Sequence, residues 1–231
     1  MSVYKVGDST STLVMIFATF SVFYPINLYI FEFIFSKKND TLKVKVASIT
    51  FSCLILSEIL NFSFDFTWNW RILKWFLIGI GPFVLPWLFT EPVENEGIGT
   101  LLFWRNFVIA PTCEEFYYRI LLPKINENIW LLSISFSLAH AHPFMFQKNW
   151  KKKNFIMAQC FISFWFGFIC NVIRLKMDTG LNNFWVFLAL STIHGIANYC
   201  GIPLIELEKG KILFFIQIFT LLSSLYLICK K

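Results

Sequence analysis

Long apolar stretches separated by short polar ones dominate the pattern along the chain. The stretches are Leu13–Ser36, Val46–Phe64, Trp75–Phe89, Leu101–Leu122, Ile129–Phe146, Phe155–Ile173, Phe184–Pro203 and Ile212–Cys229. Their apolar residues are continuous and do not alternate with polar ones, which favours helices over the strands of a membrane barrel. Because a helix needs about 20 apolar residues to cross a bilayer, the pattern predicts an all-α integral membrane protein. We expect about eight transmembrane or membrane-embedded helices in one bundle.

Composition supports a membrane protein. Of the 231 residues, 57% are hydrophobic and only 15% are charged, values outside the range of an ordinary soluble domain. The net charge of +6 is spread over loops and forms no basic stripe. The lipid bilayer is therefore an expected partner and nucleic acid is not. The six cysteines show no close pairing and lie mostly in apolar stretches, which favours buried small side chains over disulfides or a zinc cluster.

The chain shows no internal repeat, linker or change of composition, so we expect a single domain over residues 1–231. The stretch that begins at Leu13 is too long and bulky for a cleavable signal peptide and is expected to remain as a membrane anchor. Pro82 and Pro86 predict that the third helix is bent or re-entrant.

Charged residues interrupt the fourth apolar stretch. A charge at membrane depth costs about 2.5–3.5 kcal/mol on insertion scales, so it is a functional hypothesis by default. Pro111 is expected to open a helix or to break a longer one. Glu114 and Glu115 would then lie in the first turn after it, at the positive end of the helix dipole. Glu115 and Arg119 have the spacing of a helical ion pair, and Glu114 points about 100° away from Glu115, which leaves it for chemistry.

A purely structural interpretation of these charges is equally open. Both glutamates could serve only to neutralise Arg105 and Arg119, because ion pairs also hold membrane helices together. These residues alone do not decide between the two interpretations.

All three histidines fall in two short patterns. In the first, Phe136 and His140 share a helical face, whereas His142 is turned to the other side just before a proline. In the second, His194 and Asn198 are four residues apart and present an imidazole and an amide side by side. A lone intramembrane histidine is often an interhelical hydrogen-bond donor. Two such patterns together with a glutamate pair favour a site.

Three kinds of hydrolytic chemistry fit these residues. A glutamate and a histidine can deprotonate a water held between them, while a second imidazole and an amide stabilise the oxyanion. Two histidines and a glutamate could instead bind zinc, although the His-Glu-x-x-His pattern is absent. Cys113 could act as a nucleophile, but its helical neighbours point away from it and no base is placed beside it. We rank glutamate-activated water first, a metal second and the thiol third.

Three motifs in order resemble the CAAX prenyl protease 2 family, the Ras-converting endopeptidases of the CAAX protease and bacteriocin-processing superfamily. The first motif lies in the fourth apolar stretch and reads Arg-Asn-x-Val-Ile-Ala-Pro-x-x-Glu-Glu-x-x-x-Arg-x-x-Leu-Pro. The second is Phe-x-x-x-His, at Phe136 and His140. The third is His-x-x-x-Asn, at His194 and Asn198.

The resemblance implies a multi-pass protease of the endoplasmic reticulum membrane, with a motif-bearing core at about residues 101–203. Such enzymes remove the C-terminal tripeptide from prenylated CAAX proteins such as Ras-type small GTPases. By this resemblance Glu114 and His140 would activate the water, and His194 and Asn198 would stabilise the oxyanion. The supporting motif residues would be Glu115, Arg119 and Phe136. No cofactor is expected, and a zinc-dependent version of the same protease ranks behind.

Two rival functions belong to other classes, a non-catalytic membrane scaffold and an ion-binding transporter. A scaffold would tolerate the loss of Glu114 or His194 without losing a chemical activity. A transporter would normally show repeated halves with discontinuous paired segments, which the sequence does not contain. We therefore expect a polar site formed by the helices at residues 101–122, 129–146 and 184–203.

Overall fold

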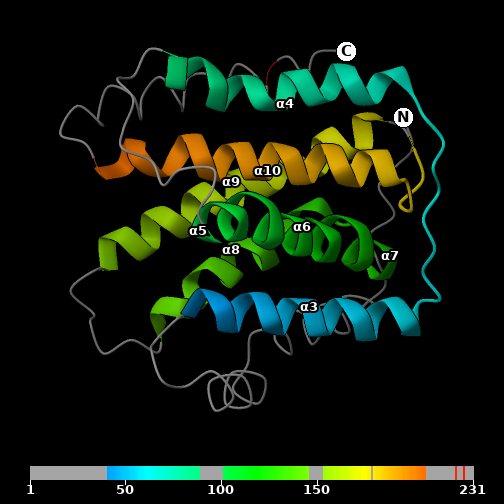
Figure 1. The fold of residues 1–231 in the computed structure, drawn as a ribbon, viewed down its shortest axis with the longest axis horizontal. Helices are drawn as coiled ribbons and strands as arrows, with labels where there is room; N and C mark the ends of the chain where they lie inside the picture. Colours follow the sequence, from blue (N-terminus) through cyan, green and yellow to red (C-terminus); the bar gives the residue numbers. More distant parts are fainter. Residues whose placement is uncertain are drawn as a thin grey trace. The chain divides into compact units, whose positions relative to one another are not determined.

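The computed structural model describes residues 41–88, 101–145, 153–177 and 179–206, together with residues 222 and 226. Within these ranges the chain is helical, and only an isolated bridge between Asp65 and Asn183 has β character (Figure 1). The all-helical prediction is confirmed for this part of the chain. The first and last expected helices lie almost wholly outside the described residues, so the expected number of about eight stays a prediction.

The helices follow the apolar stretches closely. Their bounds are α3 Thr41–Ile59, α4 Trp70–Leu88, α5 Leu101–Trp104, η1 Arg105–Ile109, α6 Ala110–Glu115, η2 Phe116–Leu121, α7 Leu122–Ile125, α8 Ile129–Met145, α9 Lys153–Met177 and α10 Phe184–Glu206. The elements from α5 to α7 follow one another without a break and form one helical run, in which η1 and η2 are π-helical. The run corresponds to the fourth apolar stretch.

Contacts divide the chain into two compact units that are each discontinuous in sequence. The first unit comprises Met1–Ser63 and Phe116–Asn171, and the second comprises Phe64–Glu115 and Val172–Lys231. The expected single domain stays a prediction.

In the first unit, α3 and α8 pack against η2. Asn128 begins α8 because its side-chain oxygen accepts hydrogen bonds from the backbone N–H groups of Trp130, at 3.0 Å, and Leu131, at 3.3 Å. The Trp130 ring packs against the Phe168 ring of α9, with centroids 4.7 Å apart. The Ser137 hydroxyl donates to the Cys160 carbonyl over 2.7 Å. Ring packing and this hydrogen bond therefore hold α8 against α9.

In the second unit, α4 and α10 start together and lie side by side (Figure 1). The backbone N–H of Phe184 donates to the carbonyl of Asp65 over 2.7 Å, and the N–H of Asp65 donates to the Asn182 carbonyl over 2.9 Å. Further along the pair, Gly79 of α4 faces the side chain of Ile193 of α10, which a Cβ atom would approach to 2.6 Å. A residue without a side chain therefore allows α4 to lie close to α10 near the candidate site.

The Asn183 side chain links the start of α10 to the loop before α4. Its side-chain oxygen accepts from the backbone N–H groups of Trp185, at 3.0 Å, and Val186, at 3.1 Å, which caps α10. Its amide group donates to the Thr67 carbonyl over 2.6 Å. The residue is fully buried, so one side chain serves both as a helix cap and as the link to the loop before α4.

Helix length bears on the membrane prediction. In the described ranges, one helical segment, Cys160–Met177, is long and apolar enough to cross a bilayer. Shorter apolar helices cover Thr50–Ile59, Ile129–His140 and Phe184–Tyr199. A multi-pass topology stays a prediction. α4 is assigned without interruption through both of its prolines, and whether it is bent or re-entrant also stays open.

We expect Asn183→Ala to destabilise the protein by about 1–2 kcal/mol, because it removes a helix cap and a hydrogen bond to a loop carbonyl. Unfolding in detergent micelles, followed by tryptophan fluorescence, would measure the change. Asn182→Ala is the matched control, since Asn182 is partly exposed and takes part in this network through its backbone. The control should change stability by less than about 0.5 kcal/mol. Equal effects of the two substitutions would contradict the role of the Asn183 side chain.

Candidate active site

Two adjacent glutamates lie at the end of α6, between the π-helical segments η1 and η2. Pro111 is the second residue of α6 and cannot donate a backbone hydrogen bond, so it opens an α-helical stretch inside a longer helical run. The prediction that Glu114 and Glu115 lie in the first turn is wrong. α6 carries no acidic residue in its first turn and ends at Glu115, so the dipole of this helix does not favour the carboxylates.

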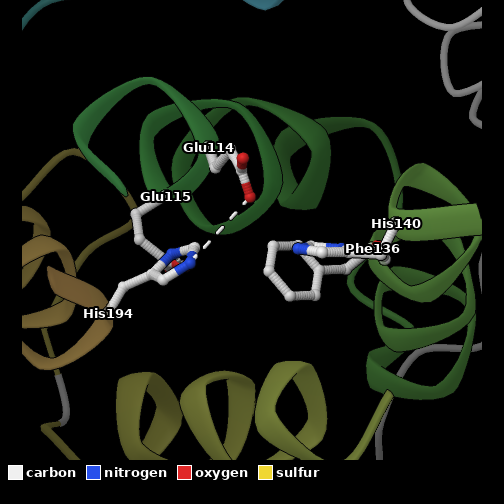
Figure 2. Close-up of polar contacts among 5 residues, drawn as sticks. All are labelled: Glu114, Glu115, Phe136, His140 and His194. Atoms are coloured by element: carbon white, nitrogen blue, oxygen red, sulfur yellow. Dashed lines mark hydrogen bonds and ion pairs between the residues drawn. The ribbon is translucent and has the colours of Figure 1, made fainter. Parts of the chain in front are cut away.

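His194 of α10 joins these two glutamates within the second unit. Its Nδ1 atom lies 2.8 Å from Oε1 of Glu115, and its Nε2 atom lies 4.0 Å from Oε2 of Glu114 (Figure 2). All three side chains are buried, and Glu115 is completely so. One imidazole therefore faces two carboxylates at a place that is shielded from the protein surface.

The short contact determines which nitrogen of His194 carries a proton. An ionised carboxylate can only accept hydrogen bonds, so Nδ1 is the donor and Glu115 is the acceptor. Nε2 is the ring nitrogen that faces Glu114. The hydrogen bond to Glu115 thus fixes the orientation of the His194 ring.

A close approach of α10 to η1 places His194 beside the two glutamates. A methyl group added to Gly195 would overlap the backbone carbonyl oxygen of Phe107 in η1. α10 therefore packs against η1 with only a hydrogen atom between the two backbones at this point. Asn198 follows one turn after His194, on the same face of α10, and is partly buried. The predicted pairing of an imidazole and an amide on one helical face agrees with this position.

The second histidine motif lies in the first unit. Nδ1 of His140 lies 2.9 Å from the carbonyl oxygen of Phe136, one turn earlier on α8. Because a carbonyl can only accept, Nδ1 is the donor, and the lone pair of the neutral ring is on Nε2. The two rings also pack together, with centroids 4.6 Å apart (Figure 2). Phe136 therefore sets both the tautomer and the orientation of His140.

Phe136 also supports the buried arginine of the first motif. The guanidinium carbon of Arg119 lies 4.5 Å from the centroid of the Phe136 ring, in cation–π geometry. Gly167 of α9 makes room for this pair, because a Cβ atom there would lie 3.1 Å from the Phe136 ring and 3.4 Å from the guanidinium. Arg119 and Phe136 are both almost completely buried. Two residues from separate motifs thus form one stack.

The expected ion pair between Glu115 and Arg119 stays a prediction, because the two residues belong to different units. The same holds for the joint action of Glu114 and His140. The contact of Glu115 with His194 was not expected. No local signal could have revealed it, since it depends on how α10 packs against α6.

The other candidates have simpler outcomes. Cys113 is partly buried, and its role as a nucleophile stays a hypothesis. His142 lies in α8, and the direction of its side chain stays a prediction. In the part of the chain that the structure describes, no group of three or more His, Cys, Asp or Glu side chains could hold a metal ion. The expectation that catalysis needs no metal is not tested by this and stays a prediction.

Comparison with known proteins found one family match. Residues 96–200 match the model of the family described as type II CAAX prenyl endopeptidase Rce1-like. The matched segment is called the Rce1-like domain. It takes up just under half of the 231 residues. No match was found among curated proteins or among solved structures.

The Rce1-like domain contains all the residues singled out above. They are Glu114, Glu115, Arg119, Phe136, His140, His194 and Asn198. The family supports a hydrolase of the protease class, an intramembrane protease of the CAAX type in general terms. The buried acid–imidazole group therefore lies inside the segment that matches a protease family.

We expect Gly195→Ala to lower the rate of the peptide cleavage proposed below by about 100-fold. The new methyl group would push α10 away from η1 and displace the adjacent His194 from its position. Gly81→Ala is the matched control, since nothing lies within 4 Å of a Cβ atom at that helical glycine. The measurement is the rate of peptide release from a CAAX reporter, with unfolding temperature recorded in parallel. Full activity of Gly195→Ala would show that the close approach does not position the histidine.

Proposed function

We propose that this chain is an intramembrane endopeptidase that removes the C-terminal tripeptide from prenylated CAAX proteins. One observation carries the proposal: the buried group of Glu114, Glu115 and His194 lies inside the Rce1-like domain. Protease families of this kind need a base for water and a donor for the oxyanion, and this group contains both types of side chain. The substrates would include Ras-type small GTPases, and the site of action would be the endoplasmic reticulum membrane.

In the proposed mechanism, Glu114 is the general base. Glu115 accepts a hydrogen bond from the Nδ1–H group of His194 and holds that ring, which favours Glu114 as the base that acts on the water. The Glu114 carboxylate takes a proton from the water while the oxygen of that water attacks the carbon of the scissile carbonyl. His140 would assist through Nε2, which its bond to the Phe136 carbonyl leaves with the lone pair. The proton then passes to the leaving amine as the carbon–nitrogen bond breaks.

His194 and Asn198 would stabilise the oxyanion of the tetrahedral intermediate. For this role Nε2 of His194 must carry a proton, and the contact of Nδ1 with Glu115 holds the ring with Nε2 toward Glu114. The base and the oxyanion donor lie 4.0 Å apart, so both can reach one carbonyl group. The amide of Asn198 would add a second donor from the same face of α10.

The protein would fit the membrane-bound substrate through its apolar composition. The chain contains 29 phenylalanines, enough to line a path for a prenyl chain, although packing and lipid contact account for most of them. About eight helices crossing or entering the bilayer would hold the Rce1-like domain at the depth of the lipid-anchored substrate.

We expect Glu114→Gln to lower the release of the tripeptide from a farnesylated CAAX reporter by at least about 100-fold, because the amide cannot accept the proton of water. The assay uses membranes that contain the full chain, and mass spectrometry detects the tripeptide. Glu127→Gln is the matched control, because it makes the same change at an exposed position and should leave the rate unaltered.

The outcomes separate the competing functions. Release that survives Glu114→Gln would move the base to Glu115 or to a metal-bound water. No release by the folded wild-type chain, across several CAAX sequences, would contradict the protease and favour a membrane scaffold.

A chelator distinguishes the two forms of the protease. We expect 1,10-phenanthroline to leave the rate unchanged within about twofold, because a carboxylate base works without a metal. A zinc-dependent enzyme would lose activity with the chelator and regain it with added zinc. Such a loss and recovery would replace Glu114 as the base by a zinc-bound water.

A further inference from the structure

Aromatic rings gather where α4 and α10 begin in the second unit. This aromatic end consists of Phe64, Phe66, Trp68, Trp70, Phe184 and Trp185. The Trp68 ring lies 5.4 Å from the Trp185 ring and 6.3 Å from the Trp70 ring, and the Phe66 and Phe184 rings lie 5.0 Å apart. The six side chains thus form a connected group across the two helix starts.

The outer rings of this group are open to the surroundings. Trp70 is 74% exposed, Phe66 is 62% exposed and Trp68 is 48% exposed. Three large aromatic side chains exposed together are unusual on a surface that faces only water, and such a patch marks an interaction site. The chemistry of the patch must therefore identify what it contacts.

The backbone behind the aromatic end is held firmly. The Trp185 indole N–H donates to the Phe66 carbonyl over 2.9 Å. The Thr67 hydroxyl and backbone N–H both donate to one carboxylate oxygen of Asp65, over 2.6 and 3.0 Å. The exposed rings therefore do not result from a loose loop.

Positive charges follow directly on α4. Arg71 and Lys74 are exposed in its first turn and a half, and the Lys74 amine lies 5.4 Å from the centroid of the Trp75 ring. The only acidic residue of the segment 64–75 is Asp65. Its hydrogen bonds from Thr67 lower the pKa of its carboxyl, and they also engage the charge within the loop. Two cations, Arg71 and Lys74, against the one carboxylate of Asp65 give this exposed segment a net positive charge.

We propose that the aromatic end is a membrane-interface anchor that contacts lipid headgroups. Indole rings prefer the boundary between hydrocarbon and headgroups, where one part of the ring is apolar and the other polar. Arginine and lysine beside them can bind the lipid phosphates, while their stems lie along the apolar layer. The inference rests on the proposed membrane location of the protease but not on its catalytic activity.

The anchor determines how deep the candidate site lies. His194 follows Trp185 by nine residues on α10, which corresponds to about 14 Å along the helix axis. The hydrocarbon core of a bilayer is about 30 Å thick. If Trp185 marks one interface, His194 and the glutamates beside it lie near the middle of the core. The same helix that carries the histidine would set its depth.

A depth measurement on the full chain in lipid nanodiscs tests the anchor. An environment-sensitive fluorophore is attached to Trp70→Cys, in a background without the native cysteines, and is quenched by lipids with nitroxides at known depths. Leu77→Cys is the matched control, because Leu77 is 55% exposed on the same helix. Seven residues separate the two positions, so we expect position 77 to lie about 10 Å deeper than position 70. Position 70 should respond most to the headgroup-level quencher.

Three results would overturn the anchor. In the first, only an aqueous quencher reaches position 70. In the second, position 70 lies as deep as position 77. In the third, position 70 is shielded from both water and lipid, as expected if a second copy of the chain covered it. A second measurement avoids the cysteine-free background: brominated lipids should quench the native tryptophan fluorescence less after Trp70→Phe. These readouts need no protease activity, so they fail or succeed separately from the proposed function.

The contribution of the cations is tested in the same way. Replacing Arg71 and Lys74 together by glutamine should let position 70 move deeper, because the phosphate contacts that hold it at the headgroups are lost. An unchanged depth would overturn the part of the proposal that involves these two side chains and limit the anchor to the aromatic rings.

Discussion

The burial of two adjacent carboxylates is the constraint on which the candidate site depends. An ionised group deep in the protein must have a partner of opposite charge or a set of donors, and removing one partner of a buried pair typically costs about 3–5 kcal/mol. Glu114 and Glu115 are buried, and His194 is the partner that α10 brings to them. The two carboxylates of α6 therefore depend on the packing of α10 for their contact with His194. The two glycines at the contacts of α10 with α4 and η1, Gly79 and Gly195, permit that packing.

The two histidines acquire different chemistry from their neighbours. Nδ1 of His194 donates to the Glu115 carboxylate, which leaves Nε2 facing Glu114. Nδ1 of His140 donates to the Phe136 carbonyl, so a neutral ring has its lone pair on Nε2. The two imidazoles are thus oriented for different roles. In the proposed reaction His194 stabilises the oxyanion, and His140 assists Glu114 in activating the water.

Features that depend on local pattern could be predicted from the sequence. Continuous apolar stretches located the described helices, because a buried helix needs apolar residues on every side. The spacing of His194 and Asn198, and of Phe136 and His140, correctly placed each pair on one helix. The capping role of Asn183 needed tertiary information, since its side chain also reaches the loop at Thr67. The contact between Glu115 and His194 likewise joins residues 79 positions apart.

The position of the glutamates in their helix could not be predicted, because π-helical turns are not visible in an apolar pattern. A π turn contains one residue more than the α turn it replaces, since its hydrogen bonds skip five residues instead of four. Each extra residue rotates everything after it by about 100° relative to a regular helix. If η1 were one residue shorter, this part of the chain could form a regular α-helix. Glu114 and Glu115 would then no longer face α10. The π-helical turn in η1 therefore determines the rotation of α6 at which both acidic side chains face α10.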